Sequence, residues 1–369
     1  MKIAYVALHL EKKFILGGVG HKIQSHRRIW QEMGHEARVF LLSPDRINLP
    51  EVKCFRYSAT SACAPLRFIQ REIARSRALR KLIRAVREYK PDVIYLRYGL
   101  FAYPLQKLFH IAPVVIEINT DDIREYRHRG LFFYLLNRLT RGISLRRAAG
   151  YVPISQEIAN LPASKKFCKP MQVIPNGFDL SATDHLPAPH NKIPRVAFVG
   201  NMEAVWNGVD KLMDLAYFAP EIHIDVIGMS KEQIPLENYP PNVQFHGLVS
   251  FQKVKEILAG ADAAISALAL HRKPSYENSL LKVRESIAYG IPIILAYYDS
   301  DISGKDFEFV LEIPNTESNV LEHTEEIKEF IFRMVGKRAD RSKIAPLIDQ
   351  RKKEEQRIEF FEEILLLSN

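Results

Sequence analysis

The strongest constraint in this sequence is an alternation of short apolar segments with longer amphipathic ones, which runs through the chain twice. The first series predicts buried strands at residues 3–8, 37–42, 93–96, 114–118 and 151–154. After a stretch with three prolines at residues 181–194, a second series predicts strands at residues 196–199, 223–227, 243–245, 263–266 and 293–295. Strands that alternate with helices form parallel sheets with helices on both faces. The sequence therefore predicts an α/β protein with two doubly wound, Rossmann-like domains.

Chain length and the proline-rich stretch set the expected domain boundaries. At 369 residues the chain exceeds what one compact core usually holds. We expect an N-terminal domain at residues 1–182, a linker at residues 183–194 and a C-terminal domain at residues 195–349. A charged helix at about residues 350–369 is expected to pack back on the N-terminal domain. We expect the two domains to face a central cleft, since ligands bind such sheets at the carboxyl ends of their strands.

Composition and cysteine placement narrow the class of protein. No apolar run reaches the roughly 18 residues that a membrane-spanning helix needs. The apolar run in the first ten residues is too short and too interrupted for a signal peptide, so we expect a buried first strand there. Cys54, Cys63 and Cys168 lack metal-binding spacing and are odd in number, which favours free thiols in a reducing compartment. The expected location is the cytoplasm, including the inner face of the membrane.

Positive charge is concentrated in the first half of the chain. Residues 1–180 hold 31 Lys and Arg against 14 Asp and Glu, a net charge of +17, whereas residues 181–369 hold 21 against 29, a net charge of −8. Residues 66–90 carry nine basic and two acidic residues, and residues 124–147 carry seven and one, with an aromatic and aliphatic run at residues 131–136. Basic, amphipathic and aromatic segments together are typical of a site that binds an anionic membrane surface.

These basic stretches have two other interpretations. Each stretch could be a helix that packs on the sheet and presents a solvated arginine face. A nucleic-acid groove is not expected, because no RNA- or DNA-binding module accompanies the charge. In the membrane interpretation, the arginines expected to contact the lipid are Arg75, Arg77, Arg80 and Arg84.

The clearest chemical motif is the segment ENSLLKVRE, which begins at Glu277 and ends at Glu285. We expect one helix that carries both glutamates on the same face about two turns apart, with Glu277 near its N-terminus. Carboxylates accept hydrogen bonds from the vicinal hydroxyls of a ribose or a hexose. A solvated amphipathic helix with incidental glutamates is the alternative.

Several segments together resemble glycosyltransferase family 4, whose members are retaining enzymes of the GT-B fold. The segment from Glu277 to Glu285 resembles the family's E-x7-E motif. Further segments follow in the family's order: the glycine loop GGVG at 17–20, PDVI at 91–94, VIPNGFD at 173–179, FVG at 198–200, NVQFHG at 242–247 and ADA at 261–263. Each segment is weak alone, but the ordered set covers nearly the whole chain.

The resemblance implies transfer of a sugar from a nucleotide-sugar donor, with retention of configuration and with no essential metal or other cofactor. It implies that Glu285 holds the donor ribose and that Glu277 contacts the transferred sugar as a catalytic residue. The other donor contacts that it implies, by position in the family's motifs, are Gly17, Gly18, Asn176, Gly200, Asn201, Asn207 and His246.

The sequence departs from the family where the leaving diphosphate is bound. Family members usually carry an arginine after the first strand of the donor domain and a lysine before the next helix. This chain has Asn201 and Asn207 at those positions. A missing cation would cost roughly 3–4 kcal/mol of transition-state stabilisation. We therefore expect another cation, and favour Lys282 because it lies three residues before Glu285 on a neighbouring helical face. An exposed surface lysine is the alternative, and the other candidates are Lys211, Arg272, Lys273 and Arg284.

The acceptor domain also departs from the usual family pattern. Many members have a histidine after the strand at residues 114–118, whereas this chain has Glu117 and Asn119, similar to a subgroup with an E-x-N sequence. We expect Glu117 and Asn119 to contact substrate in catalytic roles, with side chains that point in different directions. Arg97 and Asp121 are the predicted acceptor contacts, and a helix N-cap is the alternative role for Asp121.

The predicted function is retaining sugar transfer to a glycan or lipid-linked acceptor, in the synthesis of a cell-surface polysaccharide or glycolipid. A sugar-nucleotide epimerase of the same fold is one alternative. A catalytically impaired nucleotide-sugar-binding subunit is another, because of Asn201 and Asn207. The base, the sugar, the acceptor and the oligomeric state are left open by the sequence.

Overall fold

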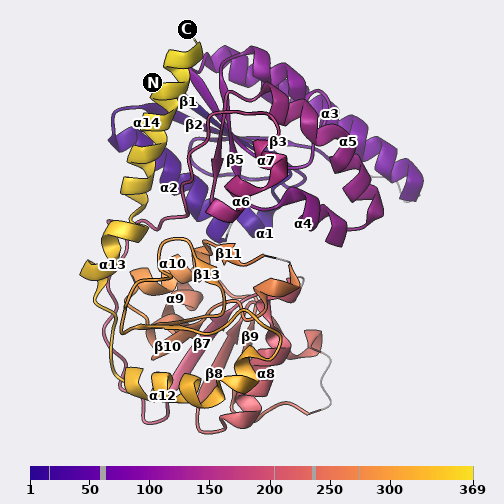
Figure 1. Ribbon diagram of the computed structural model, residues 1–369. Helices are drawn as coiled ribbons and strands as arrows, with labels where there is room; N and C mark the ends of the chain where they lie inside the picture. The colour runs from indigo at the N-terminus through magenta and orange to yellow at the C-terminus, as the bar shows by residue number, and fades with distance from the viewer. Residues whose placement is uncertain (16, 59–63, 203, 235–237, 274, 369) are drawn as a thin grey trace. The chain divides into compact units, whose positions relative to one another are not determined.

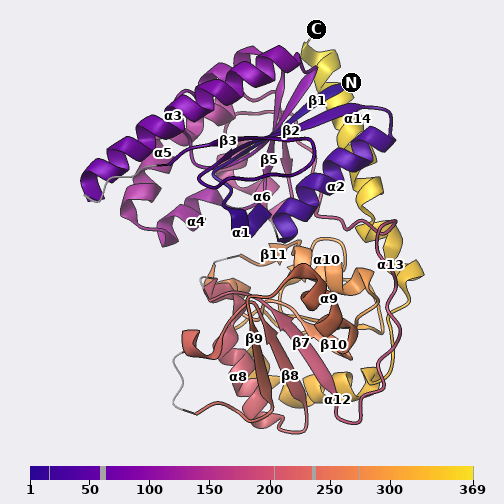
Figure 2. The same ribbon diagram turned by 180° about the vertical axis from the view of Figure 1, so that it is seen from behind.

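The computed structural model describes residues 1–15, 17–58, 64–202, 204–234, 238–273 and 275–368. The chain forms two compact units, of which unit 1 comprises Met1–Pro175 with Gln350–Asn369 and unit 2 comprises Asn176–Asp349. Figures 1 and 2 show both units from opposite sides. Each unit is built on one six-stranded parallel sheet with helices, so the predicted fold class is confirmed. Residues 183–194, which the sequence analysis placed in a linker, belong to unit 2.

The sheet of unit 1 has the strand order β3-β2-β1-β4-β5-β6. Its strands are β1 (Lys2–Leu8), β2 (Glu36–Ser43), β3 (Val52–Arg56), β4 (Val93–Arg97), β5 (Val114–Ile118) and β6 (Gly150–Pro153). All neighbouring pairs are parallel. The order reverses between β1 and β4, and ligands of such sheets bind where this reversal occurs.

Helices lie on both faces of this sheet. On one face α3 buries Leu79, Leu82 and Val86. On the other face Trp30 and Phe361 are buried between the sheet and two helices. The helical elements of unit 1 are α1 (Lys12–Ile15), α2 (Gly18–Glu32), α3 (Ala64–Tyr89), η1 (Leu105–His110), α4 (Asp122–His128), α5 (Leu131–Arg147), α6 (Gln156–Asn160), α7 (Pro162–Lys165) and α14 (Gln350–Ser368).

Unit 2 repeats this plan with the strand order β14-β12-β10-β7-β8-β9. Its strands are β7 (Arg195–Val199), β8 (His223–Ile227), β9 (Val243–Gly247), β10 (Ala263–Ile265), β12 (Ile293–Leu295) and β14 (Val310–Glu312). A separate pair is formed by β11 (Glu277–Asn278) and β13 (Tyr298–Asp299). The helical elements are η2 (Val205–Asn207), α8 (Val209–Phe218), η3 (Lys231–Gln233), α9 (Phe251–Ala259), η4 (Leu270–Arg272), α10 (Leu281–Ala288), α11 (Asn319–Glu322), α12 (Thr324–Met334) and α13 (Arg341–Ile348).

The predicted glycine loop at residues 17–20 is largely helical instead. Gly17 is the N-cap of α2, and the helix begins at Gly18. Gly20 lies inside the first turn, where a Cβ would come within 1.7 Å of the carbonyl oxygen of Ile15. The glycine at position 20 is therefore explained by the close packing of α1 on α2.

No helix in the described part of the chain is both long and apolar enough to span a membrane. Cys54 and Cys168 are free thiols, and Cys63 lies outside the described residues.

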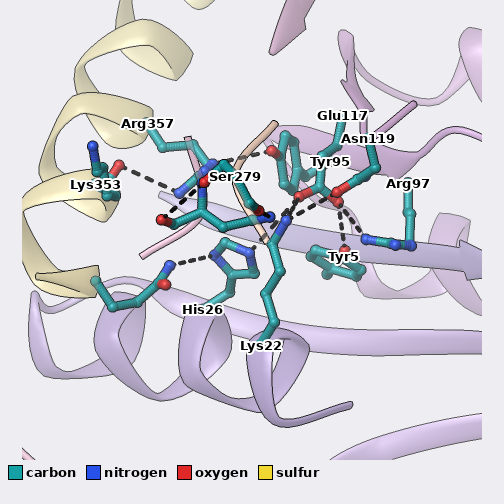
Figure 3. A network of polar contacts seen from close by, with 12 residues as sticks. Tyr5, Lys22, His26, Tyr95, Arg97, Glu117, Asn119, Ser279, Lys353 and Arg357 are labelled. Carbon is teal, nitrogen blue, oxygen red and sulfur yellow. Dashed lines mark hydrogen bonds and ion pairs between the residues drawn. The ribbon is translucent and has the colours of Figure 1, made fainter. Parts of the chain in front are cut away.

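A buried polar network fastens α14 to the rest of unit 1 (Figure 3). Arg357 donates from Nε to the hydroxyl of Tyr95 at 3.0 Å and pairs through Nη1 with Oε1 of Glu354. His26 of α2 contacts the same carboxylate oxygen at 2.6 Å. Although burial by itself raises the pKa of Glu354, Arg357 and His26 lower it to about 2. This carboxylate is therefore ionised, and it is stable inside the unit only because charged and polar partners surround it.

We predict that Arg357→Leu destabilises unit 1 by about 3–5 kcal/mol, because it leaves a buried carboxylate without its strongest partner. Arg351→Leu is the matched control, since Arg351 lies on the same helix but forms exposed pairs with Glu32 and Glu355. Its loss should cost less than about 1 kcal/mol. Urea unfolding of the full chain measures both values, and equal losses would contradict the structural role of the buried network.

Candidate functional site

The carboxyl edge of β7 and β8 is formed by two glycines in close contact. Gly228 has a φ of +91°, and a Cβ there would lie 2.3 Å from the carbonyl oxygen of Gly200. A Cβ on Gly200 would lie 2.8 Å from the ring of Phe198 and 3.1 Å from Nδ2 of Asn207. Neither position accommodates a side chain, because other atoms of unit 2 already lie where the Cβ would be, so both glycines are explained by the close approach of the two strand ends.

Asn201 and Asn207, which stand at the positions of the expected cations, form hydrogen bonds within their own loop. Oδ1 of Asn201 accepts a hydrogen bond from the backbone N–H of Ala204 at 3.0 Å. Nδ2 of Asn207 donates to the carbonyl oxygen of Asn201 at 2.9 Å. These amides shape the loop that leads from β7 to α8, and neither carries the positive charge that a diphosphate requires.

Lys282 of α10 reaches this same loop. Its Nζ donates to the carbonyl oxygen of Val199 at 2.8 Å and to Oδ1 of Asn207 at 3.1 Å, and it lies 4.6 Å from the centre of the Phe198 ring. Burial lowers the pKa of Lys282 to about 7, and no described carboxylate contributes to that shift. The ammonium group is therefore held at the edge of β7 without a counter-charge, which is the arrangement that a bound anion would complete.

Glu285 lies one turn further along α10. Its Oε1 is buried and has no hydrogen-bond partner among the described residues. Burial raises the pKa of Glu285 to about 7. An unpartnered buried carboxylate destabilises a folded protein, so its retention here indicates a ligand that donates hydrogen bonds to it.

A fully buried arginine holds the start of α10 in place. Arg284 donates to the carbonyl oxygen of Asn176 at 2.8 Å and to Oγ of Ser279 at 2.8 Å. It also pairs with Asp299 at 2.8 Å and with Asp301 at 3.0 Å. The backbone N–H of Asn176 donates to Oγ of Ser279, and the side-chain amide of Asn176 donates to the carbonyl oxygen of Ser279. Asn176, a predicted donor contact, therefore joins the first residue of unit 2 to the turn before α10, and its Oδ1 is buried without a described partner.

The prediction that Glu277 lies on the same helix as Glu285 is wrong. Glu277 belongs to β11, which pairs in parallel with β13, and α10 begins only at Leu281. Leu280 has an extended backbone, and the contacts of Ser279 with Asn176 and Arg284 keep this turn out of the helix. Glu277 itself is buried. The two glutamates of the motif therefore come from a strand and a helix, not from two turns of one helix.

The other candidate cations have different partners. Arg284 is neutralised by Asp299 and Asp301. Lys211 donates to Oδ1 of Asn319 at 3.0 Å and to a backbone carbonyl. Arg272 pairs with Asp210 and Glu317. Lys273 lies 4.7 Å above the ring of Trp206. Of the five candidates, Lys282 is the one hydrogen-bonded to Asn207.

His246 at the end of β9 contacts a buried carboxylate. Its Nε2 lies 2.6 Å from Oδ1 of Asp225, which also pairs with Arg195. Burial tends to raise the pKa of Asp225, but hydrogen bonds from Arg195 and His246 lower it. His246, a predicted donor contact, is therefore held on the sheet through its Nε2. A ligand would have to meet the ring itself or its Nδ1.

In unit 1 the predicted catalytic pair lies around one lysine (Figure 3). Nζ of Lys22 lies 2.5 Å from Oε1 of Glu117 and 3.1 Å from Oδ1 of Asn119. Glu117 also accepts from the hydroxyl of Tyr5 at 2.9 Å and from Arg97 at 3.3 Å. The expectation that Glu117 and Asn119 point in different directions is wrong, because residues two apart in a strand share a face.

These contacts give Glu117 a largely structural environment. Its side chain has no exposed surface. Although burial by itself raises the pKa of Glu117, Lys22 and Arg97 hold it well below its usual value. Arg97, a predicted acceptor contact, retains 18% exposure and Nδ2 of Asn119 is buried without a described partner. Arg97 and Asn119 are therefore better placed to meet a ligand than Glu117.

Asp121 caps α4, which was the alternative interpretation from the sequence. Its Oδ1 accepts from the backbone N–H groups of Ile123 at 3.0 Å and Arg124 at 3.2 Å. Gly17 and Gly18 form the N-terminus of α2 without a side-chain cap. The described residues contain no group of three or more His, Cys, Asp or Glu side chains arranged to hold a metal ion.

Sequence reasoning missed Lys22 and Gly228. Lys22, His26 and Trp30 recur at intervals of four along α2 and are all buried, a periodicity that signals an inward face. A lysine in such a stripe was the available signal for a buried ion pair. No local signal identified Gly228, because its contact with Gly200 joins residues far apart in the chain.

The comparisons with known proteins agree with this geometry. Residues 16–182 match the family model described as Glycosyltransferase Family 4. The first half of the chain is thus similar to this glycosyltransferase family. The two six-stranded parallel sheets correspond to the two Rossmann-like domains of the GT-B fold.

Solved structures of low sequence identity share this fold over almost their whole length. A sucrose-phosphate synthase from Thermosynechococcus elongatus is 16% identical, with a TM-score of 0.72 and 99% of each chain covered. HepE from Anabaena in complex with UDP and glucose is 16% identical, with a TM-score of 0.65 over 98% of this chain and 99% of that one. An α-glucosyltransferase in complex with UDP and DNA is 12% identical, with a TM-score of 0.65 over 97% and 99%. No curated protein sequence matches this chain.

We predict that Glu285→Gln stabilises the protein at pH 8 by about 1–2 kcal/mol and has little effect at pH 5. The pKa of Glu285 is raised from 4.5 to about 7 on folding, so the folded state keeps a proton that the unfolded state releases. The stability that this group contributes is therefore present below pH 4.5 and lost as pH rises through 7. Thermal unfolding at the two pH values measures the effect, with Glu256→Gln, an exposed glutamate paired with Lys253, as control. A variant that is equally stable or less stable at pH 8 would contradict it.

Proposed function

We propose that unit 2 binds a nucleotide-sugar donor and that the enzyme transfers the sugar, with retention of configuration, to a glycan or lipid-linked acceptor. The observation that carries the proposal is the pair of uncompensated groups on α10. Lys282 has no described counter-ion, and Glu285 has a buried oxygen without a described partner. They do not pair with each other, so the site presents one group for an anion and one for hydroxyl donors.

The two groups match the two ends of a nucleoside diphosphate. A ribose diol can donate to the carboxylate of Glu285, and a diphosphate can accept from the ammonium of Lys282. Gly200 and Gly228 keep the edge beside Lys282 free of side chains. Asn201, Asn207, His246 and Asn176 stay predicted donor contacts from the family resemblance, as do Gly17 and Gly18.

In this proposal the chemistry depends on the charge of Lys282. The bond from the anomeric carbon of the sugar to the diphosphate breaks, and negative charge grows on the leaving nucleoside diphosphate. The acceptor oxygen bonds to the anomeric carbon from the same face, and the acceptor hydroxyl gives its proton to the departing diphosphate. Lys282 stabilises the growing charge in place of the two cations that Asn201 and Asn207 lack. Glu277 is proposed to orient the transferred sugar.

The acceptor is proposed to be a glycan or lipid-linked sugar that meets unit 1, where Arg97, Asn119, Glu117 and Asp121 remain the predicted contacts. The proposed process is synthesis of a cell-surface polysaccharide or glycolipid. An anionic membrane surface is the proposed site of action, and nucleic acid is not the proposed acceptor.

A second candidate function is nucleotide-sugar binding without turnover. The observation in its favour is that the amides of Asn201 and Asn207 are both engaged by the loop and carry no charge. Incubation with donor alone and with donor plus acceptor decides between the candidates. Release of diphosphate supports the transferase, an altered donor with no release would indicate an epimerase, and no change in either would indicate the binding subunit.

We predict that Glu285→Ala weakens binding of the cognate nucleoside diphosphate by about 1.5–3 kcal/mol, because hydrogen bonds to a charged group are lost. A thermal-shift panel of UDP, GDP and ADP identifies the nucleotide, and calorimetry then gives the affinity of each variant. Glu256→Ala is again the control. A folded Glu285→Ala variant with unchanged affinity would contradict the assigned role of Glu285.

We predict that Lys282→Met lowers kcat by about 100- to 1,000-fold and changes donor affinity less, because the charge that Lys282 meets grows as the bond breaks. A second readout is proton uptake. At pH 8, above its pKa of about 7, the free amine is mostly neutral, so diphosphate binding should take up a proton in the wild type but not in Lys282→Met. Calorimetry in buffers of different ionisation enthalpy measures that uptake. Lys273→Met is the matched control, and full turnover in Lys282→Met would show that another group serves the leaving diphosphate.

A further inference from the structure

Large apolar side chains are exposed together on the first halves of α3 and α5. Leu66, Phe68 and Ile69 of α3 are 48–54% exposed. Leu131, Phe132 and Leu139 of α5 are 71%, 56% and 81% exposed. We call these six residues the α3–α5 ridge. The rings of Phe68 and Phe132 lie 5.9 Å apart, so the two groups form one surface. Both views show the two helices side by side, extending past the end of the sheet (Figures 1 and 2).

The ridge is not required by the core of unit 1. In the second half of α3, Leu79, Leu82 and Val86 are buried against the sheet. In the described side chains of the first half, from Leu66 to Arg77, none is buried. A contiguous group of large exposed apolar side chains marks a surface that a partner or a membrane covers, since such patches otherwise promote aggregation in water. The first half of α3 therefore presents a surface for something outside the unit.

The charges around the ridge limit what that partner can be. Arg67 and Arg71 on α3, and Arg127, Arg129 and Arg138 beside or on α5, are exposed. The nearby carboxylates Glu72 and Glu125 pair with arginines. An apolar centre with a basic margin complements a surface that is apolar inside and anionic outside.

Other partners fit these observations less well. A symmetric dimer across the ridge would bring the same basic margin of two copies together, which like-charge repulsion opposes. A nucleic acid would satisfy the arginines but would leave the aliphatic side chains of Leu66, Ile69, Leu131 and Leu139 without a complementary surface.

We propose that the α3–α5 ridge inserts into the surface of an anionic membrane and thereby holds unit 1 at the bilayer. The apolar side chains enter the boundary between headgroups and acyl chains, and the arginines contact anionic headgroups. The inference deepens the proposed function, because a surface of this kind selects acceptors that are presented by the membrane.

Most of the arginines that the sequence analysis expected to contact lipid have other surroundings in the structure. Arg75 is partly buried and pairs with Glu72. Arg80 lies 5.8 Å from the ring of Tyr103. Arg80 and Arg84 belong to the second half of α3, which packs on the sheet and presents a solvated arginine face there. The first half of α3 thus fits the membrane-binding interpretation of the basic stretch, and the second half fits the interpretation as a solvated arginine face.

The test uses the full chain and two kinds of vesicle, phosphatidylcholine alone and phosphatidylcholine with phosphatidylglycerol. We expect co-sedimentation with the anionic vesicles and about tenfold less with the neutral ones, weakening as salt is raised. Replacement of Leu131, Phe132 and Leu139 by serine should abolish sedimentation. The matched control replaces Tyr217 and Phe218 by serine, two exposed aromatic residues on α8 of unit 2. Replacement of Arg67, Arg71 and Arg138 by glutamine should reduce sedimentation more than replacement of Arg80 and Arg84.

Insertion itself is measured with Phe132→Trp, whose fluorescence should shift to the blue and be quenched by brominated lipid. Nucleoside diphosphate affinity of the ridge variants should equal that of the wild type, whereas Glu285→Ala should sediment normally. A failure of the ridge proposal is thus distinct from a failure of the donor site. Equal sedimentation with both vesicles, no sedimentation, or full sedimentation of the serine variant would overturn the proposal. A dimer that dissociates in the serine variant would also overturn the proposal. So would binding of duplex DNA that depends on the same arginines, if the protein does not bind vesicles.

Discussion

The geometry of unit 2 depends on the buried guanidinium of Arg284. It contacts Asn176, Ser279, Asp299 and Asp301 at once. These four residues lie at the first residue of unit 2, the turn before α10 and the segment at β13. With two carboxylates against one cation, the cluster satisfies its hydrogen bonds internally and leaves Arg284 unavailable to a ligand. Its effect is to fix the direction of α10, and with it the positions of Lys282 and Glu285.

Arg284 and Lys282 show how two cations two residues apart take opposite roles. Arg284 is neutralised by Asp299 and Asp301, whereas the hydrogen-bond partners that the structure gives for Lys282 are the uncharged oxygens of Val199 and Asn207. Lys282 and Glu285 each have a pKa moved towards neutrality by burial, so keeping either group charged inside unit 2 has an electrostatic cost. An electrostatic cost of this kind is expected at sites where a protein has lost some stability in exchange for binding.

The sequence predicted the architecture well because the strand signal is strong where a strand is buried on both faces. The segments at residues 114–118, 223–227 and 293–295 match β5, β8 and β12 to the residue. The edge strands β3 and β14 and the short pair β11 and β13 were missed, since their side chains are less buried and carry little periodicity. Glu277 was misplaced for a related reason. The spacing of the two glutamates fitted a helix. The contacts that decide otherwise are the pairing of Glu277 with Tyr298 and the hydrogen bond of Ser279 with Asn176, and both join residues far apart in sequence. The proximity of Lys282 to Asn207 was beyond any local pattern, although the loss of the usual cations indicated that a substitute was needed.

The position of α14 has a consequence for how the chain is made. Unit 1 is discontinuous, because all of unit 2 lies between its first 175 residues and its last helix. During synthesis, unit 2 is therefore complete before Glu354 and Arg357 leave the ribosome. Until then, His26 and Tyr95 lie in a nascent unit 1 whose interior polar groups lack their final partners. The N-terminal unit is the first to be translated and the last to be finished, so the closing step of folding is the docking of a helix that carries its own ion pair.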